Sequence, residues 1–169
     1  MALVGEEAPK WEATVYDNGE KKTLSSQDLE GSWYLLFFWP FDFTGVCNSE
    51  IVGFENLSAE FAALGVKLIG GSCDTFFSHE KWFASTDFEK PPSFPVIADH
   101  KHKVSKEFKI YSKKIGCSFR GTFLVNPEGI VMSECTNFLP VARDPQDVLT
   151  TAKAFVSGSA CTLPQRGSL

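Results

Sequence analysis

Residues 33–39 read Trp-Tyr-Leu-Leu-Phe-Phe-Trp, and Pro40 follows them. Seven apolar residues in a row are typical of a strand that is covered on both faces, as in the middle of a parallel sheet. The run is far too short to cross a bilayer, which takes about 20 apolar residues in a helix. The sequence therefore predicts a layered α/β protein built around this strand, which ends at Pro40.

Further elements are predicted on both sides of this strand. Apolar residues recur at three- and four-residue steps after Glu50 until Gly65 closes the pattern, which predicts a helix. Asp144 followed by Pro145 predicts the start of the last helix. In chain order, we expect strands at 11–16, 21–24 and 33–39, a helix at 50–64, a strand at 66–72, a helix at 79–88, a strand at 94–98, a helix at 104–108, strands at 122–125 and 130–138, and a helix at 145–156.

The order of these elements is a β-hairpin followed by β-α-β-α-β-α-β-β-α. Asp17-Asn18-Gly19 supplies the turn of the hairpin. Strands that alternate with helices and then end in a hairpin and a helix predict an α/β fold. We expect a thioredoxin-like three-layer sandwich, with a central mixed sheet, flanking helices and the N-terminal β-hairpin. One domain would occupy residues 1–157, and a short C-terminal tail would occupy residues 158–169.

The composition of the 169 residues narrows the function classes. A net charge of −5 argues against a nucleic-acid partner, which needs clustered Lys and Arg. The most basic stretch, residues 100–114, is interpreted as the solvated face of a helix. The N-terminus lacks the charged and apolar regions of a signal peptide, so we expect a cytoplasmic protein without a membrane partner.

Five cysteines stand at positions 47, 73, 117, 135 and 161, and none belongs to a Cys-x-x-Cys pair. An odd number without close pairs argues against a disulfide framework and against a structural metal site, so no metal is expected. Cys73, Cys117 and Cys135 fall in or beside predicted strands, and we interpret them as packing residues.

Cys47 differs from these cysteines in its position. It lies between the predicted central strand and a helix that is expected to begin near Ser49. Open α/β sheets bind ligands at the carboxyl ends of their strands, and a helix N-terminus favours a thiolate over a thiol. Thr44 stands three residues earlier, where a dithiol oxidoreductase would carry a second cysteine. The pattern therefore favours chemistry by a single thiol on a small electrophile.

The spacing Pro40-x-x-x-Thr44-x-x-Cys47 resembles the active-site signature of the peroxiredoxins. Residues 37–47, Phe-Phe-Trp-Pro-Phe-Asp-Phe-Thr-Gly-Val-Cys, resemble the typical two-cysteine subfamily, which includes the alkyl hydroperoxide reductase C proteins. The similarity covers most of the chain. It continues in Glu50-Ile51, Ser78-His79-x-x-Trp82, residues 94–99 (Phe-Pro-Val-Ile-Ala-Asp), residues 119–123 (Phe-Arg-Gly-Thr-Phe) and residues 139–143 (Leu-Pro-Val-Ala-Arg).

This resemblance implies a thiol-dependent peroxidase that reduces hydrogen peroxide and organic hydroperoxides. Cys47 would be the peroxidatic cysteine, which attacks the hydroperoxide and becomes a sulfenic acid. Thr44 would orient the peroxide through its hydroxyl. Pro40 would shield the sulfur from bulk water.

The resemblance also implies roles for three charged residues. Arg120 would hold the thiolate and stabilise charge on the peroxide oxygens, while Glu50 and Arg143 would form an ion-pair network that aims Arg120. No metal or organic cofactor is implied. The family usually has Pro-Thr directly after the cysteine, whereas this chain has Asn48-Ser49, residues that can cap the helix.

Cys161 resembles the resolving cysteine of the subfamily, which attacks the sulfenic acid of a partner subunit. The implied product is an intersubunit disulfide, so a homodimer is expected, and family members often assemble such dimers into decameric rings. Thioredoxin or a flavoprotein disulfide reductase would return the electrons.

Two alternatives stay open on the sequence. The chain could be a one-cysteine peroxidase that is resolved by an external thiol. It could instead be a redox-sensing or chaperone-like module whose thiol only senses oxidant. A general dithiol oxidoreductase is disfavoured because Thr44 occupies the position of its second cysteine.

Overall fold

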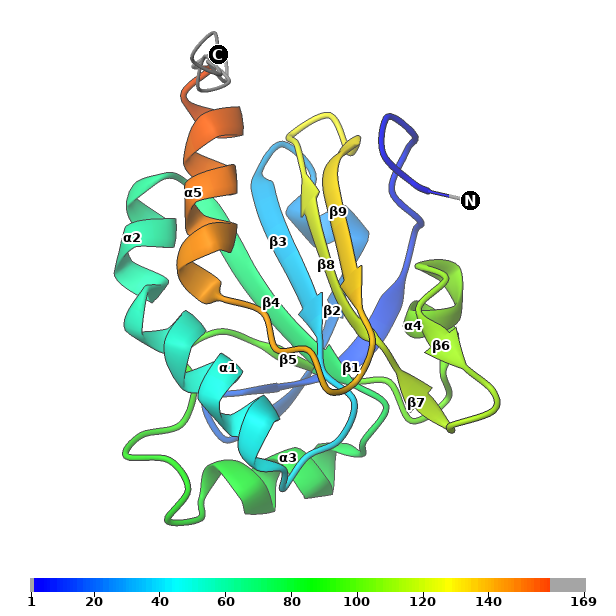
Figure 1. Ribbon diagram of the computed structural model, residues 1–169, viewed down its shortest axis with the longest axis vertical. Coiled ribbons are helices and arrows are strands. Elements are labelled where there is room, and N and C mark those ends of the chain that lie inside the picture. Colours follow the sequence, from blue (N-terminus) through cyan, green and yellow to red (C-terminus); the bar gives the residue numbers. More distant parts are fainter. Residues whose placement is uncertain (1, 159–169) are drawn as a thin grey trace, which may run out of the picture.

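The computed structural model describes residues 2–158. The apolar run forms β3 (Trp33–Phe38), which lies in the interior of a seven-stranded sheet (Figure 1). β4 (Val66–Ser72) pairs with β3 in parallel, and β8 (Arg120–Val125) pairs with it antiparallel. Successive side chains of a strand point to opposite faces, and both faces of β3 are covered, which is why the run is apolar throughout.

Four more strands complete the sheet, whose order is β2-β1-β5-β4-β3-β8-β9. β5 (Val96–Ala98) runs parallel to β4. β1 (Glu12–Asp17) and β2 (Glu20–Ser25) form the predicted hairpin at one edge, and β9 (Val131–Asn137) forms the other edge beside β8. The sheet is mixed, and this confirms the predicted thioredoxin-like arrangement.

One face of the sheet is covered by four helices (Figure 1). These are α1 (Gly45–Asn56), α2 (Ser58–Ala63), α3 (Phe76–Phe83) and α5 (Pro145–Val156). Their apolar residues form one buried cluster with Leu35, Phe37 and Trp39. The helix that carries Cys47 is therefore fixed to the sheet by a dry aromatic layer.

The other face carries shorter elements. The 3-10 helix η1 (Ser26–Leu29) and α4 (Lys103–Glu107) contribute to a second buried cluster, together with Leu36 and Phe38 of β3. A small hairpin of β6 (Tyr111–Ser112) and β7 (Cys117–Ser118) follows α4. The basic stretch 100–114 is thus helical only over α4, and β6, the two-residue strand within it, is too short to give a periodic signal.

The helix predicted for residues 50–64 is wrong at its start and in its middle. α1 begins at Gly45 because Thr44 has an extended backbone (φ −118°, ψ 141°) and its carbonyl accepts the Asn48 N–H at 3.0 Å. Leu57 leaves helical geometry (φ −99°, ψ 2°), and this separates α1 from α2. Asn48 and Ser49 lie inside α1 and do not cap it.

The helix predicted at 79–88 begins and ends earlier in the structure than expected. α3 spans Phe76–Phe83 because Thr75 caps it, its hydroxyl accepting the Ser78 N–H at 3.2 Å. The last helix is confirmed: the Asp144 carboxylate accepts the Gln146 N–H at 2.9 Å, and Pro145 takes the first helical position.

The C-terminal part of α1 is tied to the loop before β5 through Glu55. The Glu55 carboxylate accepts hydrogen bonds from the N–H and the hydroxyl of Ser93, both at 2.8 Å, and lies 2.9 Å from Lys90 Nζ. Burial raises the pKa of this carboxyl, but the bonds from Ser93 and Lys90 together outweigh burial, and the net pKa is lowered. The folded chain therefore favours the ionised form.

We expect Glu55→Gln to lower the free energy of unfolding at pH 7 by about 1 kcal/mol, since the exposed Lys90 adds little to the Ser93 bonds. A lowered pKa contributes stability that is present above the ordinary value of 4.5 and is lost as the pH falls below it. The difference in the free energy of unfolding between wild type and variant, measured by chemical unfolding, should therefore shrink towards pH 4. Glu60→Gln, at an exposed position of α2, is the control. A gap that is unchanged at pH 4 would contradict this assignment.

Candidate active site

Cys47 lies in the first turn of α1, directly after the loop that leaves β3. It is the third residue of the helix, and its side chain is 1% exposed. The first N–H groups of a helix have no intrahelical acceptor, so the end of α1 presents partial positive charge to the sulfur. A buried sulfur in this position is surrounded by features that favour its anionic form.

Arg120 supplies a full positive charge at the same sulfur. It is the first residue of β8, and its Nη1 donates to Cys47 Sγ at 3.3 Å. Its Nε donates to the carbonyl oxygen of Leu139 at 2.7 Å, which fixes the plane of the guanidinium. A charged donor that is held in place before reaction can stabilise negative charge without a cost of reorientation.

Glu50 joins this arginine to a second one. Its Oε2 accepts from Arg120 Nη1 and from Arg143 Nη2, both at 2.8 Å, and its Oε1 accepts from the backbone N–H of Arg143 at 2.7 Å. All three side chains are buried. Arg143 also reaches β8, where its Nη1 donates to the Gly121 carbonyl at 3.0 Å. The two arginines are thus oriented by a single carboxylate one helical turn after Cys47.

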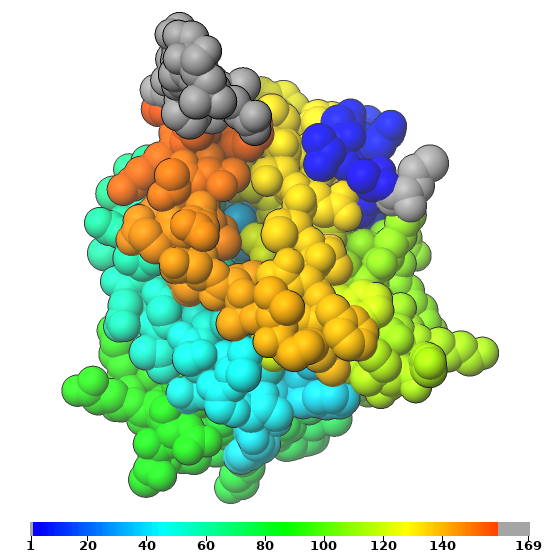
Figure 2. Space-filling view, in the orientation of Figure 1, coloured from blue at the N-terminus to red at the C-terminus, as the bar shows by residue number. Residues whose placement is uncertain are grey.

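The segment between β9 and α5 brings Arg143 to this place. Figure 2 shows this segment, in yellow and orange, lying against the beginning of α1, in cyan. The site therefore combines three parts of the chain that are distant in sequence: α1, β8 and the 138–144 segment.

Thr44 and Pro40 lie in the loop before α1. Thr44 is exposed, and its hydroxyl donates to the Phe41 carbonyl at 3.0 Å, which leaves the hydroxyl oxygen free to accept a hydrogen bond. Pro40 is buried at the end of β3. Cys47, Arg120, Glu50 and Arg143 are thus joined directly by hydrogen bonds, whereas Thr44 and Pro40 belong to the neighbouring loop.

Comparison with known proteins identifies the family of this chain. The profile of the AhpC/TSA family matches residues 4–133. This chain belongs to the AhpC/TSA family of peroxiredoxins.

Two peroxiredoxins and one solved structure illustrate the similarity. Peroxiredoxin 1 of Brugia malayi is 38% identical over 152 residues, which cover 88% of this chain and 66% of that protein. A putative peroxiredoxin in the rubredoxin operon of Clostridium pasteurianum is 37% identical, covering 95% of this chain and 93% of that protein. The crystal structure of the reduced 2-Cys peroxiredoxin of Plasmodium vivax matches with a TM-score of 0.91 at 25% identity, over 100% of this chain and 92% of that one.

The other cysteines of this peroxiredoxin chain have different surroundings. Burial raises the pKa of Cys73 to about 11 and raises the pKa of Cys117, so both favour the neutral thiol and fit the packing interpretation. That interpretation is wrong for Cys135, which is exposed on β9 because this strand is the edge of the sheet. Cys161 lies outside the described residues.

Sequence reasoning missed one part of the site region. Asp42, in the loop with Pro40 and Thr44, is buried and bonded to His79 of α3, and neither residue was among the expected site residues. The only sequence signal was the Ser78-His79 pair among the motifs that resemble the family. This pair does not indicate that Asp42 is the partner of His79.

Among residues 2–158, no three His, Cys, Asp or Glu side chains are grouped so that they could hold a metal ion. No helix in this part of the chain is long and apolar enough to cross a bilayer.

Proposed function

We propose that this chain is a thiol peroxidase in which Cys47 reduces hydrogen peroxide and organic hydroperoxides. The observation that carries the proposal is the contact of Arg120 Nη1 with Cys47 Sγ, 3.3 Å, at a buried sulfur in the first turn of a helix. A thiolate there is a nucleophile with a fixed cation beside it, which suits attack on a small polar electrophile.

The chemical step conserves atoms and electrons. The Cys47 thiolate attacks one oxygen of the hydroperoxide and the O–O bond breaks. The other oxygen leaves as water or an alcohol after it takes up a proton from solvent, which replaces the proton that the thiol released on ionisation. The sulfur loses two electrons and becomes a sulfenic acid. Arg120 stabilises the negative charge that grows on the leaving oxygen, and the Thr44 oxygen accepts the O–H of the peroxide. Glu50 and Arg143 keep Arg120 oriented, and no cofactor takes part.

The second half of the cycle needs another thiol, because Cys47 is buried and neither Cys73 nor Cys117 favours its thiolate. Cys161 of a partner subunit would condense with the sulfenic acid, releasing water and forming an intersubunit disulfide. A thioredoxin-type or flavoprotein reductant in the cytoplasm would then reduce this disulfide.

Two surface features support assembly into dimers and a decameric ring. β9 is an edge strand: Gly5 and Glu6 bond to the backbone of Val131 at its start, and within residues 2–158 no strand lies beside the rest of its outer side. Phe43 and Phe77, which are 57% and 65% exposed, add apolar surface near the loop of the site. Such surfaces are suited to a second copy of the chain.

We expect wild-type protein to consume hydroperoxide in many turnovers with a thioredoxin system, and to form a disulfide-linked dimer on non-reducing gels after peroxide treatment. Cys161→Ser should lose the dimer band and cycle at least roughly 10-fold more slowly, since the sulfenic acid then waits for an external thiol. Cys135→Ser is the matched control: it removes the exposed thiol of β9 and leaves the backbone edge of that strand unchanged. A wild type without the dimer band but with full turnover would indicate a one-cysteine cycle. A single stoichiometric oxidation would indicate a sensor.

A further inference from the structure

A cluster of buried and half-buried polar residues lies behind the loop that joins β3 to α1. We call it the loop-anchor cluster. Its members come from this loop, from the end of β4 and the turn after it, and from α3. They are Asp42, Ser72, Asp74, Ser78 and His79. Among the described residues, no member of this cluster forms a hydrogen bond with Cys47. The cluster is therefore separate from the Arg120–Glu50–Arg143 network.

His79 is fully buried, and acceptors face both of its ring nitrogens. Nε2 lies 3.1 Å from the carbonyl oxygen of Ile97, and a carbonyl can only accept, so Nε2 carries a hydrogen. Nδ1 lies 2.7 Å from Oδ2 of Asp42. A proton must therefore lie between Nδ1 and Oδ2, on one atom or the other.

The remaining contacts of Asp42 indicate that this proton is on His79. Trp39 Nε1, which is a donor only, gives its hydrogen to Asp42 Oδ1 at 2.9 Å, and the Ser78 hydroxyl donates to Oδ2 at 2.8 Å. Two donors besides His79 therefore already face the Asp42 oxygens, and such donors suit an acceptor-only carboxylate, so the shared proton lies on Nδ1. Asp42 and His79 then form a buried pair of opposite charges.

Asp74 ties the backbone of the loop to the same cluster. Its Oδ2 accepts the N–H of Asp42 at 3.0 Å and the hydroxyl of Ser72 at 2.6 Å. Burial and the nearby charge of Asp42 raise the pKa of Asp74. The His79 cation is the positive charge that faces these two carboxylates from α3, so its loss would leave two acidic groups together.

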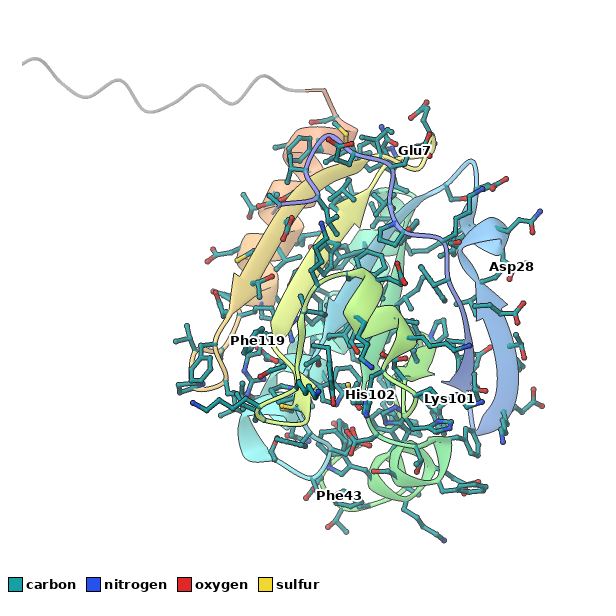
Figure 3. All side chains as sticks on the ribbon, turned by 90° about the vertical axis from the view of Figure 1, so that its right-hand side faces the viewer. Glu7, Asp28, Phe43, Lys101, His102 and Phe119 are labelled. Carbon is teal, nitrogen blue, oxygen red and sulfur yellow. The ribbon has the colours of Figure 1, made fainter. Side chains whose placement is uncertain are left out.

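The loop needs such an anchor because its conformation is strained. Phe43, next to Asp42, has φ +60°, a left-handed value that is unfavourable for a bulky residue. Its side chain is exposed and lies at the end of the molecule where α3 lies (Figure 3). Thr44 and Pro40 stand within two residues of Asp42, so a shift of Asp42 moves both of them.

We infer that His79 is a positioning residue for the peroxidase reaction: by donating from Nδ1 to Asp42, it holds the loop that presents Pro40 and Thr44 to the peroxide. The inference rests on the proposed function. His79 acts on the peroxide side of the site, whereas Arg120 acts on the thiolate. The two effects are therefore separable by choosing the electrophile.

Two amide substitutions test which nitrogen matters. In His79→Asn the amide nitrogen can take the place of Nδ1 and donate to Asp42. In His79→Gln the longer amide can take the place of Nε2 and reach the Ile97 carbonyl. His100→Asn is the matched control, since His100 is exposed and outside both polar networks. Thermal unfolding of each variant checks that it is folded.

The readout is a ratio of two rates on the reduced protein: oxidation by hydrogen peroxide and alkylation of Cys47 by iodoacetamide. We expect His79→Gln to lower this ratio roughly 10- to 100-fold, because a small displacement of orienting groups costs this much, while alkylation is unchanged or faster. His79→Asn should stay within about 3-fold of wild type. Equal ratios in both variants, whether normal or reduced, would overturn the inference.

Hydrogen exchange of the Asp42 amide separates failure of this inference from failure of the proposed function. The amide bonds to Asp74, so its protection reports the anchored loop without any peroxide. His79→Gln should accelerate its exchange by at least about 10-fold, and His79→Asn should not. If wild type does not react with peroxide, the proposed function fails. If the Asp42 amide exchanges at the same rate in wild type and in both His79 variants, the inference about His79 is wrong.

Discussion

Replacing Cys47 with serine is expected to lower the rate of peroxide reduction to that of a solution without enzyme, a loss of roughly four orders of magnitude or more. The serine hydroxyl keeps nearly the same shape and can still accept from Arg120. It is not ionised near neutral pH, and its oxygen does not accept an oxygen atom from a peroxide as sulfur does. The measurement is stopped-flow peroxide consumption with thioredoxin as reductant.

The control for this change is Cys135→Ser. It makes the same substitution at an exposed cysteine on β9 whose side chain bonds to Asn137 and not to Cys47, Arg120, Glu50 or Arg143. Full activity of this control would show that the loss belongs to the position of Cys47 and not to the number of thiols. If Cys47→Ser kept more than a tenth of the wild-type rate, the proposed function would be wrong.

The layered fold was predictable because its signals are local. The continuous apolar run of β3 and the capped start of α5 at Asp144 each involve only a few consecutive residues. The start of α1 was missed because its apolar periodicity begins only at Ile51, whereas the helix begins at Gly45. That earlier start is set by the extended backbone of Thr44, which has no signal in hydrophobic spacing.

The site was less accessible to sequence reasoning. Glu50 and Arg143 are 93 residues apart, and no periodicity brings them together, so only the resemblance to peroxiredoxins proposed the pair. The Asp42–His79 pair had no such support. A histidine among aromatic residues is indistinguishable from a core residue until the carboxylate from the other element is seen beside it.

Arg120→Gln is expected to slow oxidation of Cys47 by hydrogen peroxide roughly 100- to 1000-fold, which is the loss typical for one preorganised donor at a developing charge. Glutamine removes the cation beside Cys47 Sγ, while Glu50 keeps its bonds to Arg143 and remains paired. Alkylation by iodoacetamide should slow as well, because the thiolate itself loses its partner. This loss of both rates distinguishes Arg120 from His79, because His79→Gln should slow the reaction with peroxide and should not slow alkylation.

Arg120→Lys shows whether charge or geometry carries the effect. A lysine keeps the charge but has no planar fork, so it cannot contact Cys47 Sγ, Glu50 Oε2 and the Leu139 carbonyl together as the guanidinium does. We expect its rate to lie between those of Arg120→Gln and wild type. Lys101→Gln removes one exposed cation elsewhere and controls for net charge. If Arg120→Gln reacted with peroxide as fast as this control, the thiolate would have to be stabilised by the end of α1 alone, and the Arg120–Glu50–Arg143 network would be structural.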